Sequence, residues 1–146
     1  MAEVAIIVGS ESDMKHAENA AEVLKRIGIG HSVDVASAHR DPERLERLVA
    51  NSEAKVFIAV AGLSAALPGA IAARTARPVI GVPVDVKLEG LDAFLSMAQM
   101  PAGVPVAVVG VGNAKNAAIL AAEILSLADG AYARKLAEYR NSLRKS

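Results

Sequence analysis

The chain has 146 residues, a length that fits one domain, and its formal net charge is zero. A balanced charge argues against nucleic acid as the main partner, because phosphate binding needs a concentrated basic face. The absence of cysteine excludes disulfides and thiolate metal sites, and no apolar run reaches the ~18 residues that span a bilayer. The N-terminus lacks a basic signal-peptide region, so we expect a cytoplasmic protein with no membrane partner.

Hydrophobic residues make up 53% of the chain but aromatic residues only 3%, so the core must be built from alanine, valine, isoleucine and leucine. An apolar excess with so little aromatic bulk also suggests that some apolar surface is buried between subunits.

Five short apolar runs recur along the chain. Most are continuous and β-branched rather than alternating, which is typical of strands covered on both faces. The predicted strands are Val4–Val8, Ser32–Ala36, Val56–Ala61, Val79–Val84 and Val106–Val109.

Helix-like segments separate these runs. Gly28 is a plausible helix stop, and Asp41-Pro42-Glu43 is a strong helix start, with an N-cap residue, a proline and an acid in succession. The predicted helices are Ser12–Ile27, one that begins at Asp41-Pro42, Leu67–Arg74, Leu91–Met100, Asn113–Leu127, and a C-terminal helix with an apolar stripe of Tyr132, Leu136, Tyr139 and Leu143.

Alternating strands and helices predict an α/β fold, a three-layer α/β/α sandwich around a five-stranded parallel sheet. The common strand order for such a sheet is 2-1-3-4-5. We expect residues 1–128 to form a single domain. Residues 129–146 are expected to form a C-terminal helix that docks on this domain or on a neighbouring subunit.

Ligands of open α/β sheets bind at the carboxyl ends of the strands, so the loops after the first three strands are the informative ones. The first, Gly9-Ser10-Glu11-Ser12-Asp13, offers backbone N–H groups and two hydroxyls at a helix start, which suits an anion. The alternative is plain capping by Ser10 or Ser12, with Asp13 in the first turn. The loop is neither a Walker loop nor a GxGxxG fingerprint.

The second loop, Ser37-Ala38-His39-Arg40, combines three useful groups. Arg40 can hold a phosphate bidentately, His39 can move a proton, and Ser37 can add a hydrogen bond. The alternative is a solvated loop with a helix cap at Asp41.

The third loop runs from Gly62 to Gly69 and is nearly apolar, so it can pack over a planar ring or serve only as a tight connection. We interpret His16 as an exposed helix position and His31 as a turn residue. Because no His, Asp and Glu set has ligand spacing, we expect no metal.

Together these motifs resemble the family of 5-(carboxyamino)imidazole ribonucleotide mutase and aminoimidazole ribonucleotide carboxylase, which carries out the carboxylation step of purine biosynthesis. The resemblance covers about Val4 to Leu127. It rests on the first two loops and on Ala61-Gly62, Leu67-Pro68-Gly69, Pro78-Val79-Ile80-Gly81-Val82-Pro83-Val84, Gly90-Leu91-Asp92, Gln99-Met100-Pro101 and Lys115-Asn116-Ala117-Ala118.

The resemblance implies a flavodoxin-like domain in a homo-octamer, with active sites at subunit contacts and no metal or organic cofactor. The partners it implies are a ribonucleotide substrate and carbon dioxide. It implies His39 as the catalytic proton shuttle, and Ser10, Asp13, Ser37 and Arg40 as the residues that hold ribose and phosphate. Ser12, Gly62, Ser64 and Leu67 complete the expected substrate-binding set.

Two positions depart from the mutase branch, which usually has a histidine where this chain has Ala66 and a tryptophan where it has Met14. The carboxylase branch has Arg-Ser-Asn in the third loop, whereas this chain has Leu63-Ser64-Ala65. The mutase is the leading hypothesis, and a carboxylase that uses carbon dioxide directly is the alternative. A further alternative is a non-catalytic nucleotide-binding module or an inactive His-to-Ala variant.

Overall fold

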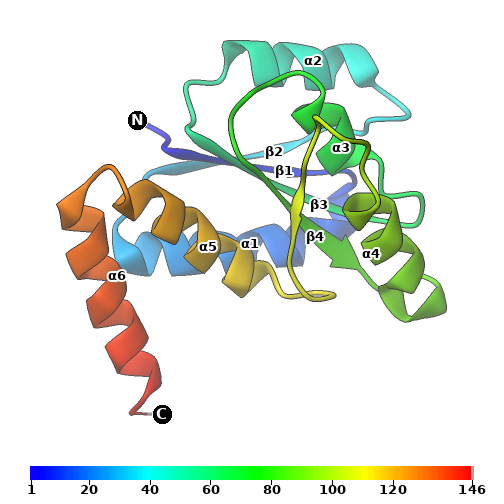
Figure 1. Ribbon diagram of the computed structural model, residues 1–146. Helices are drawn as coiled ribbons and strands as arrows, with labels where there is room; N and C mark the ends of the chain where they lie inside the picture. Colours follow the sequence, from blue (N-terminus) through cyan, green and yellow to red (C-terminus); the bar gives the residue numbers. More distant parts are fainter. Residues whose placement is uncertain (146) are drawn as a thin grey trace.

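A parallel five-stranded sheet forms the middle layer of the computed structural model, which describes residues 1–145 (Figure 1). The strand order is β2-β1-β3-β4-β5, as predicted, and it is the order of flavodoxin-like folds. The strands are β1 (Val4–Val8), β2 (His31–Val35), β3 (Val56–Gly62), β4 (Val79–Val84) and β5 (Ala107–Val108).

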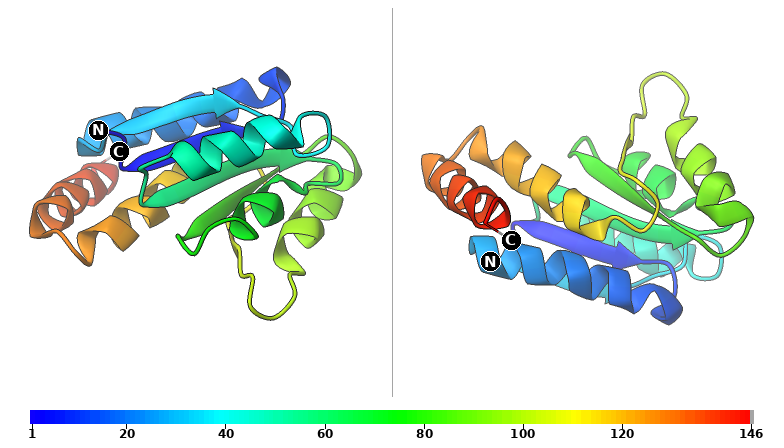
Figure 2. Two further views of the ribbon diagram at one scale, coloured as in Figure 1. Left: turned by 90° about the horizontal axis from the view of Figure 1, so that it is seen from above. Right: turned by 90° about the horizontal axis from the view of Figure 1, so that it is seen from below.

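Helices cover both faces of this sheet. One face carries α2, α3 and α4, and the other carries α1 and α5, with α6 packed across the ends of α1 and α5 (Figures 1 and 2). The helices are η1 (Glu11–Asp13), α1 (Met14–Ile27), α2 (Pro42–Asn51), α3 (Leu67–Ala72), η2 (Leu88–Gly90), α4 (Leu91–Ala98), α5 (Ala114–Ser126) and α6 (Gly130–Leu143). Within residues 1–145, no helix combines the length and the apolar character needed to cross a membrane.

The sheet separates two hydrophobic cores because successive side chains of a strand point to opposite faces. In β1, Val4, Ile6 and Val8 join the core under α1 and α5, whereas Ala5 and Ile7 join the core under α2, α3 and α4. All five side chains are buried, which explains why this strand reads as a continuous apolar run.

The predicted helix Ser12–Ile27 begins two residues later than expected. Ser10 accepts a hydrogen bond from the Ser12 backbone N–H and caps the short 3₁₀ turn η1, so the α-helical hydrogen bonds start only at Met14. At the other end Gly28 stops α1 as predicted, in the left-handed conformation with φ of 88°.

The fifth strand is one residue shorter at each end than the predicted Val106–Val109, and Pro83 gives the physical reason for its early end. The carbonyl oxygens of Gly81 and Pro83 both point toward the β5 side, where they accept from Val109 N and Gly112 N. The backbone nitrogen of Pro83 has no hydrogen to donate on that side, so the ladder between β4 and β5 ends after Gly81 pairs with Val108.

Two predicted helices also end early, since Arg74 N donates to Ile71 O three residues back and Gln99 leaves the helical region ahead of Pro101. The C-terminal helix buries two residues of its predicted stripe, Leu136 and Tyr139. It ends at Leu143, and the last residue of the predicted helix, 146, lies outside the described residues.

Candidate functional site

The three loops singled out in the sequence begin level with one another, because Val8 of β1 pairs with Val35 of β2 and with Val60 of β3. They enclose a cavity of about 630 Å³ at the carboxyl edge of the sheet. Every predicted site residue lines this cavity: Ser10, Ser12, Asp13, Ser37, His39, Arg40, Gly62, Ser64 and Leu67.

The first loop is both a helix cap and a wall of the cavity. The Ser10 hydroxyl oxygen accepts from Ser12 N at 3.4 Å and from Ser12 Oγ at 3.1 Å. The two interpretations of this loop are therefore compatible, because the hydroxyls that form the cap also line the hollow.

Within residues 1–145, Asp13 is the one charged side chain among the buried residues, with 8% of its surface exposed. Burial raises the pKa of its carboxyl group, because a carboxylate loses hydration there, and the positive charges of His16 and Lys15 partly oppose that rise. A buried carboxyl group at the N-terminus of a helix is well placed to accept hydrogen bonds from hydroxyl groups of a ligand.

Arg40 ties the second loop to the first. Its Nη2 donates to Gly9 O at 3.4 Å, and its Nε donates to Ser37 Oγ at 3.4 Å. The same Ser37 hydroxyl oxygen accepts from Arg40 N at 3.1 Å, which folds the loop into a tight turn. These bonds leave other N–H groups of the guanidinium for an anion in the cavity.

The helix start after this loop is built as predicted. Asp41 Oδ1 accepts from Arg44 N at 3.1 Å, and Pro42 occupies the first turn of α2. His39 is exposed, and it is the only histidine among the described residues that line the cavity. An imidazole can take up and release a proton, so His39 is the acid–base candidate of the site.

The third loop needs glycine at its first position. A Cβ added to Gly62 would lie 2.7 Å from Val86 Cγ2 and 3.3 Å from Val84 O, so a side chain there would push the next loop away. Leu63 follows with a φ of 57°, a strained conformation for leucine that is typical of functional loops. Ala66 is exposed and lines the cavity, at the position where the mutase branch usually has histidine.

Sequence reasoning missed Val86, which lines the cavity from the segment after β4. The strand order offered a signal, because β4 pairs with β3 and its carboxyl end therefore lies at the same edge of the sheet.

The interpretation of His16 as an exposed helix position was wrong in its exposure, although His16 does lie in α1. The side chain is half-buried beside Gly112, and its Nδ1 is enclosed without a hydrogen-bond partner. His31 is the first residue of β2 rather than a turn residue, with Nδ1 3.1 Å from Ile29 O. Among residues 1–145, no group of three or more His, Asp and Glu side chains is arranged to hold a metal ion.

Comparison with known proteins shows the family to which the chain belongs. The sequence model of the family described as AIR carboxylase matches residues 3–146. The chain belongs to the AIR carboxylase family. It is 58% identical over 142 residues to the N5-carboxyaminoimidazole ribonucleotide mutase of Methanocaldococcus jannaschii, which covers 97% of this chain and 90% of that protein.

Two further proteins are similar to this chain, one in sequence and one in structure. The N5-carboxyaminoimidazole ribonucleotide mutase of Thermotoga maritima is 47% identical over 149 residues, covering 99% of this chain and 87% of that protein. A crystal structure of a PurE2 variant from Treponema denticola superimposes with a TM-score of 0.88 at 34% identity, covering 97% of this chain and 91% of that chain.

The raised pKa of Asp13 predicts that Asp13→Asn stabilises the protein near neutral pH. The native carboxyl group holds its proton more readily than the unfolded one, so its contribution to stability is full below the ordinary value of 3.8 and is lost as pH rises through the native pKa. Urea unfolding should therefore show the variant as more stable at about pH 7, with a gap that narrows toward about pH 4.

Glu11→Gln is the matched control, because Glu11 is an exposed acid of the same loop and should leave stability nearly unchanged. If Asp13→Asn were less stable than the parent at both pH values, the native site would be holding the ionised carboxylate favourably.

Proposed function

We propose that this member of the AIR carboxylase family is an N5-carboxyaminoimidazole ribonucleotide mutase. Such an isomerase moves a carboxyl group from the exocyclic amine to ring carbon 4 of the ribonucleotide, a step of purine biosynthesis. The observation that carries the proposal is the convergence of Asp13, His39 and Arg40 on one cavity, in a chain whose relatives at 58% and 47% identity bear that name.

The substrate would lie with its phosphate and ribose across the first two loops. Arg40 and the hydroxyls of Ser10, Ser12 and Ser37 offer donors for the phosphate, and Asp13 offers an acceptor for the ribose hydroxyls. The imidazole ring would then extend toward the apolar third loop, where Gly62, Ser64 and Leu67 form the opposite wall.

His39 would move the proton that the reaction displaces. The carbamate C–N bond breaks, carbon dioxide is released into the cavity, and the exocyclic nitrogen takes one proton from protonated His39, which is left neutral. Ring carbon 4 then attacks the carbon dioxide, and loss of its own proton to His39 restores aromaticity. Recapture is fast only if the gas cannot diffuse away, since proximity makes the second step nearly unimolecular. The rearrangement has no net change of oxidation state, so it needs no redox cofactor.

The direct test supplies the purified protein with the carbamate substrate or, separately, with aminoimidazole ribonucleotide and bicarbonate. We expect turnover of the carbamate without added bicarbonate. His39→Asn should lower kcat by about 10²- to 10⁴-fold, the usual contribution of a positioned acid–base group, with a smaller change in KM. Turnover only with the second substrate pair would make the protein a direct carboxylase. Unchanged ligand binding with no turnover in either assay would make it a binding module.

Ala66 predicts a gain of function. A side chain added at this exposed position would enter the cavity that His39 also lines, from the third loop, where the mutase branch usually has a histidine. We expect Ala66→His to raise kcat for the carbamate, measured in the same assay. Ala66→Asn, which adds a polar group of similar reach without the same proton chemistry, should give no such rise. Equal rates for the parent and both variants would show that His39 alone sets the proton transfer.

We also propose that the protein works as a cytoplasmic homo-octamer with sites at subunit contacts. Large apolar side chains stand exposed in the third loop, in the segment from Val86 to Leu95 and in the loop before α5, a feature typical of interaction surfaces. They are Leu63, Val86, Leu88, Leu91, Leu95 and Val111.

Sedimentation equilibrium tests this assembly, which predicts a mass of eight times the 15.0 kDa of one chain. Leu91→Asp should lower that mass, because an unpaired charge at a buried contact is costly. Leu127→Asp is the control, since Leu127 is 88% exposed at the end of α5, outside this set of residues. A monomeric parent protein would contradict the octamer.

A further inference from the structure

We propose that Arg44 is a positioning residue for the second loop of the site, Ser37–Arg40, although Arg44 does not line the catalytic cavity. Its Nε donates to Val35 O at 2.9 Å, and its backbone N donates to Asp41 Oδ1 at 3.1 Å. Val35 is the last residue of β2, and Asp41 directly precedes α2. One residue in the first turn of α2 therefore holds both ends of the segment that carries His39.

The carbonyl that Arg44 binds has no strand partner. β2 is an edge strand and pairs only with β1, toward which Ala36 N donates to Val8 O at 2.9 Å. The backbone groups of successive strand residues point to opposite sides, so the Val35 carbonyl faces the open edge. Arg44 thus supplies the hydrogen bond that a sixth strand would otherwise make.

Few other contacts fix the second loop against the sheet. Ala36 is buried and Ala38 packs partly buried against the core, but the other side chains from Ser37 onward are half-buried or exposed. The three hydrogen bonds to Ser37 Oγ and Ser37 O stay inside the loop. The Arg40–Gly9 contact at 3.4 Å is long and exposed. The Arg44–Val35 bond is the shortest side-chain hydrogen bond among those of this region.

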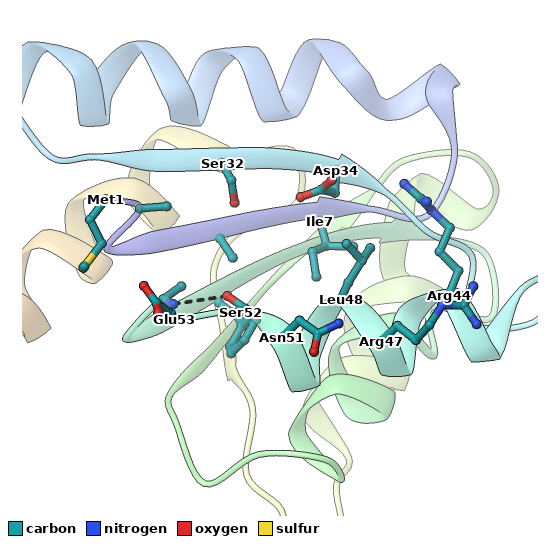
Figure 3. A pocket seen from close by; sticks show the side chains of 14 residues that line it. Met1, Ile7, Ser32, Asp34, Arg44, Arg47, Leu48, Asn51, Ser52 and Glu53 are labelled. Carbon is teal, nitrogen blue, oxygen red and sulfur yellow. Dashed lines mark hydrogen bonds between the residues drawn. The ribbon is translucent and has the colours of Figure 1, made fainter.

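A groove runs beside α2 and is lined by Ile7, Asp34 and Leu48, among others. The positions of the side chains around it are consistent with this role of Arg44. Figure 3 shows Arg44 and Arg47 projecting from α2 at the end of the groove where β2 finishes, away from Met1 and Glu53. Arg44 also lines the small hollow that Arg40 and Asp41 share with the first loop, so it lies between the groove and the site.

A second arginine, Arg77, lies in the segment before β4 and makes hydrogen bonds at the C-terminal end of α2. Arg77 Nη1 donates to Ser52 O and to Ala54 O at 2.7 Å, its Nη2 donates to Val49 O at 3.0 Å, and its guanidinium lies 4.7 Å from the centre of the Phe57 ring. These contacts fix the C-terminal end of α2. The whole ten-residue helix separates that end from the loop that carries His39. Arg77 should therefore support stability without setting the loop.

The experiment compares Arg44→Met with Arg44→Lys, Arg77→Met and Arg47→Met, the last being an exposed arginine one turn along the same helix. Amide hydrogen exchange reports loop order directly, and kcat and KM for the carbamate report its effect on the reaction. We expect Arg44→Met to speed exchange in residues 37–41 and to lower kcat/KM roughly ten- to hundredfold, with both kcat and KM affected because the loop holds both His39 and Arg40.

The controls should separate positioning from folding. Arg44→Lys keeps a donor and should recover part of the loss. Arg77→Met should melt several degrees lower and exchange faster in residues 49–55, while kcat and KM stay near the parent values. Arg47→Met should change neither the melting temperature nor the hydrogen exchange, and its kcat and KM should stay near the parent values.

The proposal would be overturned if Arg44→Met had the same hydrogen exchange, kcat and KM as the parent protein. It would also be overturned if Arg44→Met had a lower melting temperature and faster exchange throughout the chain, without a specific effect on residues 37–41. If Arg44→Met did not fold, Arg44→Lys would decide, because slower turnover at an unchanged melting temperature requires a positioning role. The kinetic readout rests on the proposed function. If the parent protein turned over neither substrate, that function would fail, and exchange in residues 37–41 would still decide the role of Arg44.

Discussion

The parallel register of β1 with both of its neighbours is the constraint on which the site depends. Val8 lies beside Val35 on one side and Val60 on the other, so the chain leaves three adjacent strands at one level. Short side chains such as those of Ser10 and Ser37 can then reach one cavity with the long guanidinium of Arg40. A shift of one residue in the pairing of β1 with β2 would move the second loop along the strand direction by about 3.3 Å and break the contact between Arg40 and Gly9 O.

The sequence was sufficient to predict the strands, the helix caps and three of the loops that line the cavity, because each depends on local patterns, whereas the strand order was predicted as the common order of such sheets. Continuous apolar runs mark strands with two covered faces, and Asp41-Pro42 starts α2 through bonds within its own turn. The length of β5 was not predictable in this way. It depends on the side to which the nitrogen of Pro83 points, and that follows from the register of a neighbouring strand.

Contacts between distant segments account for the rest of what the sequence could not provide. Val86 enters the cavity because Gly62 has no side chain to exclude it, a relation between two strand ends that no periodicity encodes. His16 is half-buried because the segment around Gly112 packs beside it. The residues that hold the second loop, including Arg44 through Val35 O, likewise become visible only when β2 and α2 are placed in space. The chemistry-bearing residues were found from their types and their strand-end positions, whereas their mutual distances required the fold.

The open edge formed by β2 has a consequence for the protein in a crowded solution. An exposed strand edge is a template on which the strand of another molecule can add, and such pairing leads to aggregation. Here the outward carbonyl of Val35 is already occupied by Arg44, and Asp34 places a carboxylate in the same strand. The contact that we propose to order the site loop therefore also removes one hydrogen-bond acceptor from the open edge of the sheet.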